Sequence, residues 1–329
     1  MSWTLFRAPA RGVLPDSLAC ALVLLLVPAS SQAQTLKVTL LGTGSPPPEI
    51  DRFGPSTLVE AGTERLVLDA GRGASQRLAQ LGIRLGQVNA LFLTHLHSDH
   101  VVGIPDLWLH RWVGLSGPGA PLEVFGPSGT REMMAFLGQA YQADVRQREE
   151  PGARARPANF TVIAHDAVQG VVYERNGVTV TAFDVDHGEP KMPAFGYRID
   201  YAGRSVVISG DTRPSDNLVR FARGTDVLIH EVMAARPQAL SRSEALRRTV
   251  GSHTTPEDAG TVFARVKPRL AVYTHVSLMA AARSAIAELA ASIVPRTRST
   301  YAGPLEVGED LMAIEIGETI EVRRLATAR

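Results

Sequence analysis

Cysteine is almost absent from the chain, because Cys20 is the only one among its 329 residues. A single thiol excludes an internal disulfide framework and a zinc site built from several cysteines. If this chain binds a metal, the ligands must therefore be nitrogen and oxygen atoms from histidine and acidic side chains.

An excess of charge of one sign is also missing. The chain has 34 lysine and arginine residues against 33 aspartate and glutamate residues, and its formal net charge is +1. Without a strongly basic field there is little general attraction to a phosphate backbone. The composition therefore argues against a nucleic-acid partner.

Apolar runs long enough to cross a membrane are missing near the N-terminus. The run at 18–27 is preceded by Arg7 and Arg11 and followed by the small residues of 31–33. At about ten residues it is too short for a span of ~20, and the pattern is typical of a signal peptide cleaved after Ala33. An uncleaved membrane anchor is the alternative. We expect residues 1–33 to be a signal peptide and 34–329 to be one catalytic domain. That domain would be periplasmic or secreted, without stable membrane association.

The overall composition, with 45% hydrophobic and 20% charged residues, is that of an ordinary globular protein. Strands and helices are expected in mixed order, which suits two mixed sheets between helical layers. Residues 114–121 and 144–158 are expected to be loops. Strands are predicted at 36–41, 57–60, 65–69, 88–93, 122–125, 160–165, 171–175, 178–184, 195–201, 204–209, 226–230 and 269–274, and helices at 74–82, 101–113, 129–141, 215–223, 240–249, 256–266 and 279–291.

The most informative segment is Thr-His-Leu-His-Ser-Asp-His at 94–100, which follows an apolar strand. Imidazole and carboxylate groups are the ligands that suit zinc and similar divalent metals. His95 and His97 are two apart and point the same way in an extended segment, while Asp99 and His100 follow where the chain turns. The pattern predicts a metal site, with a histidine-rich surface loop as the alternative.

Other expected strands also end in polar residues. His187 follows one strand, Gly210 and Asp211 follow a second, and His230-Glu231 and His275 close two more. A lone histidine at a strand end is usually structural. Several arriving at one sheet edge indicate a shared site.

Together with Ser252-His253-Thr254-Thr255, these motifs resemble the metallo-β-lactamase superfamily. They are most similar to its branch of ribonuclease Z and bacterial periplasmic arylsulfatases, and the likeness covers 36–320. The resemblance implies an α/β fold, the αββα four-layer sandwich (the metallo-β-lactamase fold). It also implies a cofactor of two divalent metal ions. Zinc is expected, and iron or manganese stay open.

The resemblance also implies a role for each residue. Asp69 would support the site, Asp99 would orient the attacking water, His253 would face the substrate, and Glu231 would fix the His253 ring. His230 is either part of this arrangement or a buried structural histidine. The implied metal ligands are His95, His97 and His187 for one ion, Asp99, His100 and His275 for the other, and Asp211 between them.

The expected activity is hydrolysis of a small ester, an aryl sulfate or a phosphodiester, by a metal-bridging hydroxide. One alternative is a ribonuclease Z-like endonuclease that processes tRNA 3′ ends. The short stretch from His187 to Asp211 leaves no room for the long arm of that family, and export removes access to tRNA. Lactonase or β-lactamase activity and a non-enzymatic metal-binding protein are further alternatives. A small-molecule ester is the expected partner, and a homodimer stays open.

The N-terminal pattern gives a direct prediction. After expression in a bacterial host, the exported protein should begin at Gln34, because cleavage is expected after Ala33. N-terminal sequencing and intact mass would measure this. Recovery of a protein that retains Arg7 and the apolar run would contradict cleavage and favour the membrane anchor.

Overall fold

The structure is a computed structural model that describes residues 35–113, 120–150, 160–188, 192–280 and 284–325. The chain divides into two compact units, 1–32 and 33–329, and only the second contains described residues. The expected signal peptide therefore lies outside the described residues and stays a prediction. No helix within the described ranges is both long and apolar enough to cross a bilayer.

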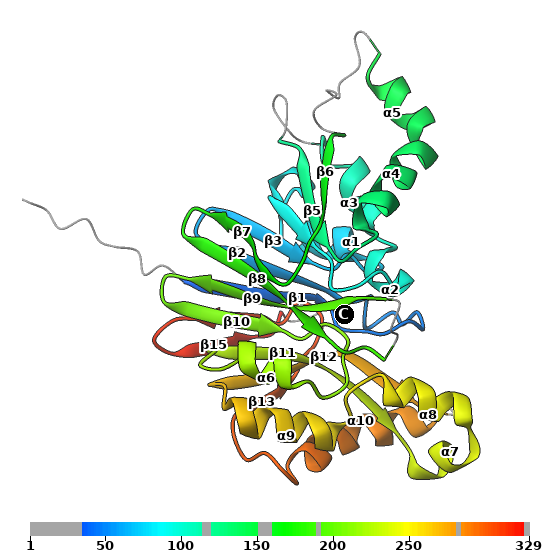
Figure 1. The fold of residues 1–329 in the computed structure, drawn as a ribbon, viewed down its shortest axis with the longest axis vertical. Coiled ribbons are helices and arrows are strands. Elements are labelled where there is room, and N and C mark those ends of the chain that lie inside the picture. Colours follow the sequence, from blue (N-terminus) through cyan, green and yellow to red (C-terminus); the bar gives the residue numbers. More distant parts are fainter. Residues whose placement is uncertain (1–34, 114–119, 151–159, 189–191, 281–283, 326–329) are drawn as a thin grey trace, which may run out of the picture. The chain divides into compact units, whose positions relative to one another are not determined.

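Two β-sheets form the centre of the unit 33–329 (Figure 1). In the described residues the first sheet has eight strands in the order β15-β14-β1-β2-β3-β4-β5-β6, and the second has seven in the order β13-β12-β11-β10-β9-β8-β7. The strands are β1 (Leu36–Gly42), β2 (Ser56–Ala61), β3 (Glu64–Leu68), β4 (Ala90–Phe92), β5 (Leu122–Gly126), β6 (Val162–Asp166), β7 (Gly170–Arg175), β8 (Val178–Val185), β9 (Ala194–Tyr201), β10 (Arg204–Ile208), β11 (Val227–Ala235), β12 (Leu270–Met279), β13 (Leu305–Val307), β14 (Ala313–Ile316) and β15 (Ile320–Arg323).

The central strands bury both faces, so successive side chains enter different layers of the core. In β3, Leu66 and Leu68 pack between the two sheets, whereas Val67 packs under the helices outside the first sheet. Helices α1 (Ala74–Gln80), α3 (Ile104–Leu109) and α4 (Thr130–Ala140) contribute to that outer layer. Helices α6 (Asp216–Phe221), α9 (Pro256–Val266) and α10 (Ser284–Thr297) cover the other sheet. The expected αββα sandwich is confirmed.

Several elements differ from the sequence prediction. The C-terminal strands β13, β14 and β15 were not predicted, because three or four residues carry too little alternation. The expected loop 144–158 overlaps helix α5 (Gln142–Arg148), and its residues 151–159 lie outside the description, as do 114–119 of the other expected loop. The single helix expected at 240–249 is two helices, α7 (Pro237–Arg242) and α8 (Glu244–Gly251). They separate because Ser243 is extended and its hydroxyl accepts the Leu246 N–H. The remaining helices are α2 (Ser98–Val101) and the 3₁₀ turn η1 (Leu85–Gln87).

Parallel pairing decides where the polar strand ends meet. β3, β4 and β5 are parallel in the first sheet, and β10, β11 and β12 are parallel in the second. Asp69 directly follows β3, His95 lies just beyond β4, and Asp211 lies just beyond β10. The carboxyl ends of these strands therefore deliver side chains from both sheets to one end of the sandwich.

Candidate metal centre

The loop after β4 is held by a buried carboxylate. Asp69 accepts the backbone N–H of Thr94 at 2.8 Å and the Thr94 hydroxyl at 2.8 Å. Its Oδ2 also accepts the Nδ1–H of His100 at 2.8 Å. Burial lowers the pKa of His100, but the Asp211 and Asp69 carboxylates outweigh burial and raise that pKa well above its usual value. With Nδ1 so engaged, Nε2 is the nitrogen that faces the other ligands. Asp69 therefore orients the motif at 94–100 from behind, as the resemblance implies.

Three imidazoles form the first ligand group. The His97 Nδ1 lies 2.8 Å from the His95 Nε2 and 3.2 Å from the His187 Nε2. The His187 Nδ1–H donates to the Ser252 carbonyl at 2.9 Å, which leaves its Nε2 turned to the group. Burial, reinforced by neighbouring histidines, lowers the pKa of both His95 and His97. These rings are thus favoured as neutral bases, the form that binds a metal.

Asp99, His100 and His275 form the second group. The Asp99 Oδ2 lies 3.3 Å from the His275 Nε2 and 3.6 Å from the His100 Nε2. All three side chains are buried, and the His100 Nε2 has no hydrogen-bond partner. A buried nitrogen that lacks a hydrogen-bond partner and faces a carboxylate is suited to binding a cation.

Asp211 joins the two groups. It is 3% exposed, and its Oδ1 is buried without a hydrogen-bond partner. Burial would raise the pKa of this carboxyl, but the histidines around it, His275 and His100 first, hold the pKa well below its usual range. The Asp211 Oδ2 lies between 3.3 and 4.0 Å from a ring nitrogen of His95, His100, His187, His253 and His275.

Gly210 allows Asp211 to come this close. Its φ of +61° lies in the left-handed region, and a Cβ built there would sit 2.5 Å from the Phe195 carbonyl oxygen and 3.0 Å from the Thr94 Cβ. Any side chain would force β9 or the motif loop away.

His275 reaches the centre through a β-bulge. In the pairing of β11 with β12, Glu231 lies opposite Thr274 and Val232 lies opposite Val276, so His275 is the extra residue. Its φ is 44°, a left-handed value that is uncommon outside glycine. Bulges re-aim a side chain next to active sites, and this one turns His275 toward Asp99 and Asp211.

The bulge is anchored by a residue far along the chain. The Val276 N–H donates to the Thr43 carbonyl at 2.9 Å. The Thr43 N–H and hydroxyl both donate to the Asp310 Oδ1 at 2.9 Å, and Arg77 pairs with the other oxygen at 2.8 Å. Asp310 thereby fixes the loop on which the backbone next to His275 rests.

These residues fit two divalent cations. All seven residues that the resemblance implies as ligands are brought together, and their donors are the imidazole and carboxylate atoms that zinc, iron and manganese accept. The two orphaned atoms, His100 Nε2 and Asp211 Oδ1, are buried within the set. Donor atoms within 4.8 Å of one another come from His95, His97 and His187, from His95, His100 and Asp211, and from Asp99, His100 and His275.

His253 and Glu231 lie beside these groups. The Glu231 Oε1 accepts the His253 Nδ1–H at 3.0 Å and the backbone N–H of Thr212 at 2.9 Å. Burial lowers the pKa of His253, but the Glu231 and Asp211 carboxylates outweigh burial and raise that pKa to about 9. Glu231 thus holds a proton on His253, which lines the cavity above the centre.

His230 has a structural position. Its Nδ1–H donates to the Glu231 carbonyl at 2.7 Å, and its ring packs edge-on against Phe263 at 5.7 Å, on the side covered by α9. The ring is fully buried and belongs to none of the possible metal groups among the described residues. Of the two open interpretations of His230, the structure favours the structural one.

A cavity of about 700 Å³ opens over the centre. Its walls include Arg213, Arg248 and Met279, none of which was singled out from the sequence. Arg213 could have been found from its place, two residues after Asp211. Arg248 has no comparable signal, because only the α8 geometry brings it to the wall.

Comparisons with known proteins agree with this arrangement. The family model described as "Beta-lactamase superfamily domain" matches residues 64–276. The chain is 36% identical over 283 residues to Ribonuclease Z of Mycobacterium sp. (strain KMS), which covers 85% of this chain and 96% of that protein. It is 37% identical over 286 residues to Ribonuclease Z of Mycobacterium avium (strain 104), with 85% and 98% covered.

Solved structures show the same fold. The human short-form tRNase Z has a TM-score of 0.62 at 22% identity, covering 84% of this chain and 98% of that one. The metallo-β-lactamase fold protein YhfI from Bacillus subtilis has a TM-score of 0.63 at 18% identity, covering 86% and 100%. Because this fold implies divalent metals, it agrees with the donor set above.

The relatives correct one expectation. A small-molecule ester was expected as the partner and a nucleic acid was not, yet the curated relatives of this chain are named Ribonuclease Z. The expectation was wrong because net charge is a sum over the whole surface. Arg213 and Arg248 stand at the cavity itself, and two divalent cations would add positive charge that no composition count contains.

Asp211 provides a test of the shared carboxylate. Replacing it with alanine should reduce bound metal from two ions per chain to one or none, because both ligand groups lose their common oxygen. Elemental analysis of the purified variant measures this. Asp216→Ala removes an exposed aspartate on α6 that pairs with Arg265, and it should keep both ions. Two full metal ions in the Asp211→Ala protein would refute the shared role.

Proposed function

The chain belongs to the metallo-β-lactamase superfamily, in its ribonuclease Z-like branch, and we propose that it hydrolyses an RNA phosphodiester, with precursor tRNA as the substrate. The choice of RNA rests on one observation. Relatives named Ribonuclease Z are 34–37% identical to this chain over 85% of its length. The geometry of the centre supports hydrolysis as the reaction.

The ligand groups described above would hold the two cations, with Asp211 common to both. When bound, two divalent ions supply Lewis acidity, which activates water and offsets negative charge on the phosphate oxygens. The chain itself places the carboxylate of Asp99 beside the second group of ligands and favours the neutral form of His95 through burial. The Ser252 carbonyl engages the His187 Nδ1–H, which turns the Nε2 of that ring inward. A phosphodiester in the cavity would lie over these groups.

His253 is suited to serve as the general acid. Its Nδ1–H is engaged by Glu231, so the other ring nitrogen is the one available to a leaving oxygen. The His253 pKa of about 9 keeps the ring protonated at neutral pH. Cations bound at Asp211 would offset part of that carboxylate's charge, whereas Glu231 would still hold the proton. Glu231 is therefore a positioning residue and His253 the proton donor.

Two arginine side chains at the cavity wall are placed to attract the phosphates of an RNA substrate. Arg213 pairs with Asp186 at 2.7 Å and Arg248 pairs with Glu244 at 2.8 Å, and all of these side chains are exposed. Exposed pairs are weak, of order 0–1 kcal/mol, so either guanidinium can turn to a phosphate at little cost. Both arginines can thus contribute to RNA binding.

The first test is cleavage itself. The metal-loaded protein should cut a precursor tRNA with a 3′ extension and leave a duplex DNA control intact. Dialysis against a chelator should abolish cleavage, and Zn²⁺ or Mn²⁺ should restore it, because the donor set accepts either ion. Gel analysis of end-labelled RNA measures the result. Hydrolysis of aryl sulfates with no cleavage of any RNA would overturn the proposal.

The second test concerns His253. His253→Ala should lower turnover by about 10²–10⁴, the usual contribution of general acid catalysis, with metal content unchanged. The ring carries the proton below its pKa, so turnover should fall as the pH rises through that pKa, which bound cations would bring below about 9. Glu231→Gln removes the carboxylate charge that raises the His253 pKa. In this variant turnover should therefore begin to fall at a lower pH.

Steady-state rates across pH 6 to 10 and elemental analysis measure both effects. His110→Ala is the matched control, because this exposed histidine pairs with Asp106 outside the cavity and should leave rate and pH profile unchanged. An unaltered rate in His253→Ala would remove this residue from the mechanism.

A further inference from the structure

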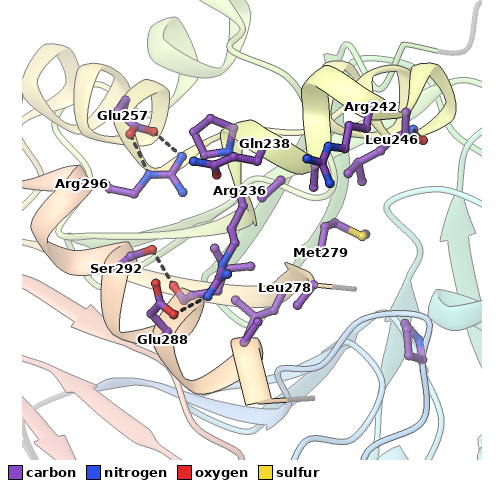
Figure 2. Close-up of a pocket in the computed structure, with 18 residues that line it drawn as sticks. Arg236, Gln238, Arg242, Leu246, Glu257, Leu278, Met279, Glu288, Ser292 and Arg296 are labelled. Atoms are coloured by element: carbon purple, nitrogen blue, oxygen red, sulfur yellow. Dashed lines mark hydrogen bonds and ion pairs between the residues drawn. The ribbon is translucent and has the colours of Figure 1, made fainter. Parts of the chain in front are cut away.

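A second hollow adjoins the cavity over the metal centre. It measures about 1200 Å³ and runs between α7 and α10, as Figure 2 shows. Met279 lines both spaces, and Pro46 of the cavity is followed by Pro47 of the hollow. We call this hollow the α7–α10 groove. A molecule that lies over the metal centre can continue into it past Met279.

The α7–α10 groove has an aliphatic lining. Leu246 of α8, Leu278 and Met279 of β12, and Ala285 and Leu289 of α10 contribute to it, and no aromatic residue of the described chain does. Aliphatic and thioether groups pack against flat apolar surfaces without demanding one shape. The lining therefore suits ring faces of varied identity.

The cations at the rim of the groove are not equivalent. Arg236 pairs with Glu288, and Arg296 pairs with Glu257 at 2.7 Å (Figure 2). Arg242 at the end of α7 is exposed, and no acidic side chain among the described residues pairs with it. Three arginines against two glutamates leave one positive charge on the lining, and it resides on Arg242.

We propose that the α7–α10 groove binds unpaired nucleotides that flank the scissile phosphodiester of an RNA substrate. A phosphate would meet Arg242, and base faces would pack against Leu246, Leu278 and Met279. This assignment rests on the proposed function, because the groove receives whatever continues from the bond over the metal centre.

Three features favour this occupant. The groove is continuous with the cavity, so its ligand is part of the substrate rather than a separate molecule. Its one uncompensated charge is positive, which matches a phosphate. The described stretch 192–211 holds only β9, a tight turn at Ala202-Gly203, and β10. It therefore offers no long arm to hold RNA, and the contacts with an RNA substrate would come from other surfaces.

The test compares Arg242→Ala and Arg242→Glu with the wild type on two substrates. One is a precursor tRNA with an unpaired 3′ extension, and the other is bis(p-nitrophenyl) phosphate, which is too short to leave the cavity. On the RNA, KM should rise about tenfold in Arg242→Ala, and more in Arg242→Glu. The rise should exceed any change on the small diester at least fivefold. In Arg242→Ala, the slope of log affinity against log salt should fall by about 0.7, the value for one phosphate of a single strand.

Two further variants make the result specific. Ala285→Phe narrows the groove without altering charge, and it should also raise KM for the extended RNA. Arg223→Glu is the matched control, since Arg223 is exposed at the opposite end of the parallel strands, before β11, and should change nothing.

Each outcome decides the proposal. An unchanged KM and salt slope in both Arg242 variants, with RNA cleavage intact, would overturn the groove assignment and leave the proposed function standing. Equal loss on RNA and on the small diester would also overturn it, since the effect would then lie in the cavity. Absence of RNA cleavage by the wild type would refute the proposed function and, with it, this occupant.

Discussion

The carboxylate of Asp211 is the constraint on which the site depends. It is buried among ring nitrogens of five histidines, at distances of 3.3 to 4.0 Å, and one of its oxygens has no partner. A buried carboxylate is costly unless positive charge compensates it, and among these rings His253 holds a proton whereas burial favours the neutral form of His95. The unpartnered oxygen of Asp211 fits the cations that the donor set would hold, and their binding would add to the stability of the folded site.

Three of the rings around Asp211 are oriented from their far side. Asp69 holds His100, the Ser252 carbonyl holds His187, and Glu231 holds His253. These partners decide which nitrogen carries the proton and which one faces inward. Glu231 does more than orient its ring, because its charge also raises the pKa of His253 and so keeps a proton on it.

The sequence predicted the fold, and it singled out residues that the structure brings together, because both leave local signals. Apolar runs followed by His95, Asp211 or His275 mark strand ends, and parallel pairing brings such ends together. The bulge at His275 and the split between α7 and α8 at Ser243 leave no such signal, because they depend on pairing with distant strands and on a single cap. The prediction of a small-molecule ester as the partner was wrong for a related reason. A sum of charges cannot show that Arg242 lacks a partner or that Arg248 reaches the cavity wall.

The anchoring of the bulge by Asp310 makes the centre depend on the C-terminal part of the domain. Strand β1 pairs with β14, and the loop after β1 rests on the Asp310 carboxylate, so the start and the end of the domain close on each other. The part of the chain before β11 supplies His95, His187 and Asp211, but not His275 or its support. A chain that ended before β12 would lack both His275 and Asp310, so its second group of donors would be incomplete. The full donor set therefore depends on the last strands of the domain as well as on the motif at 94–100.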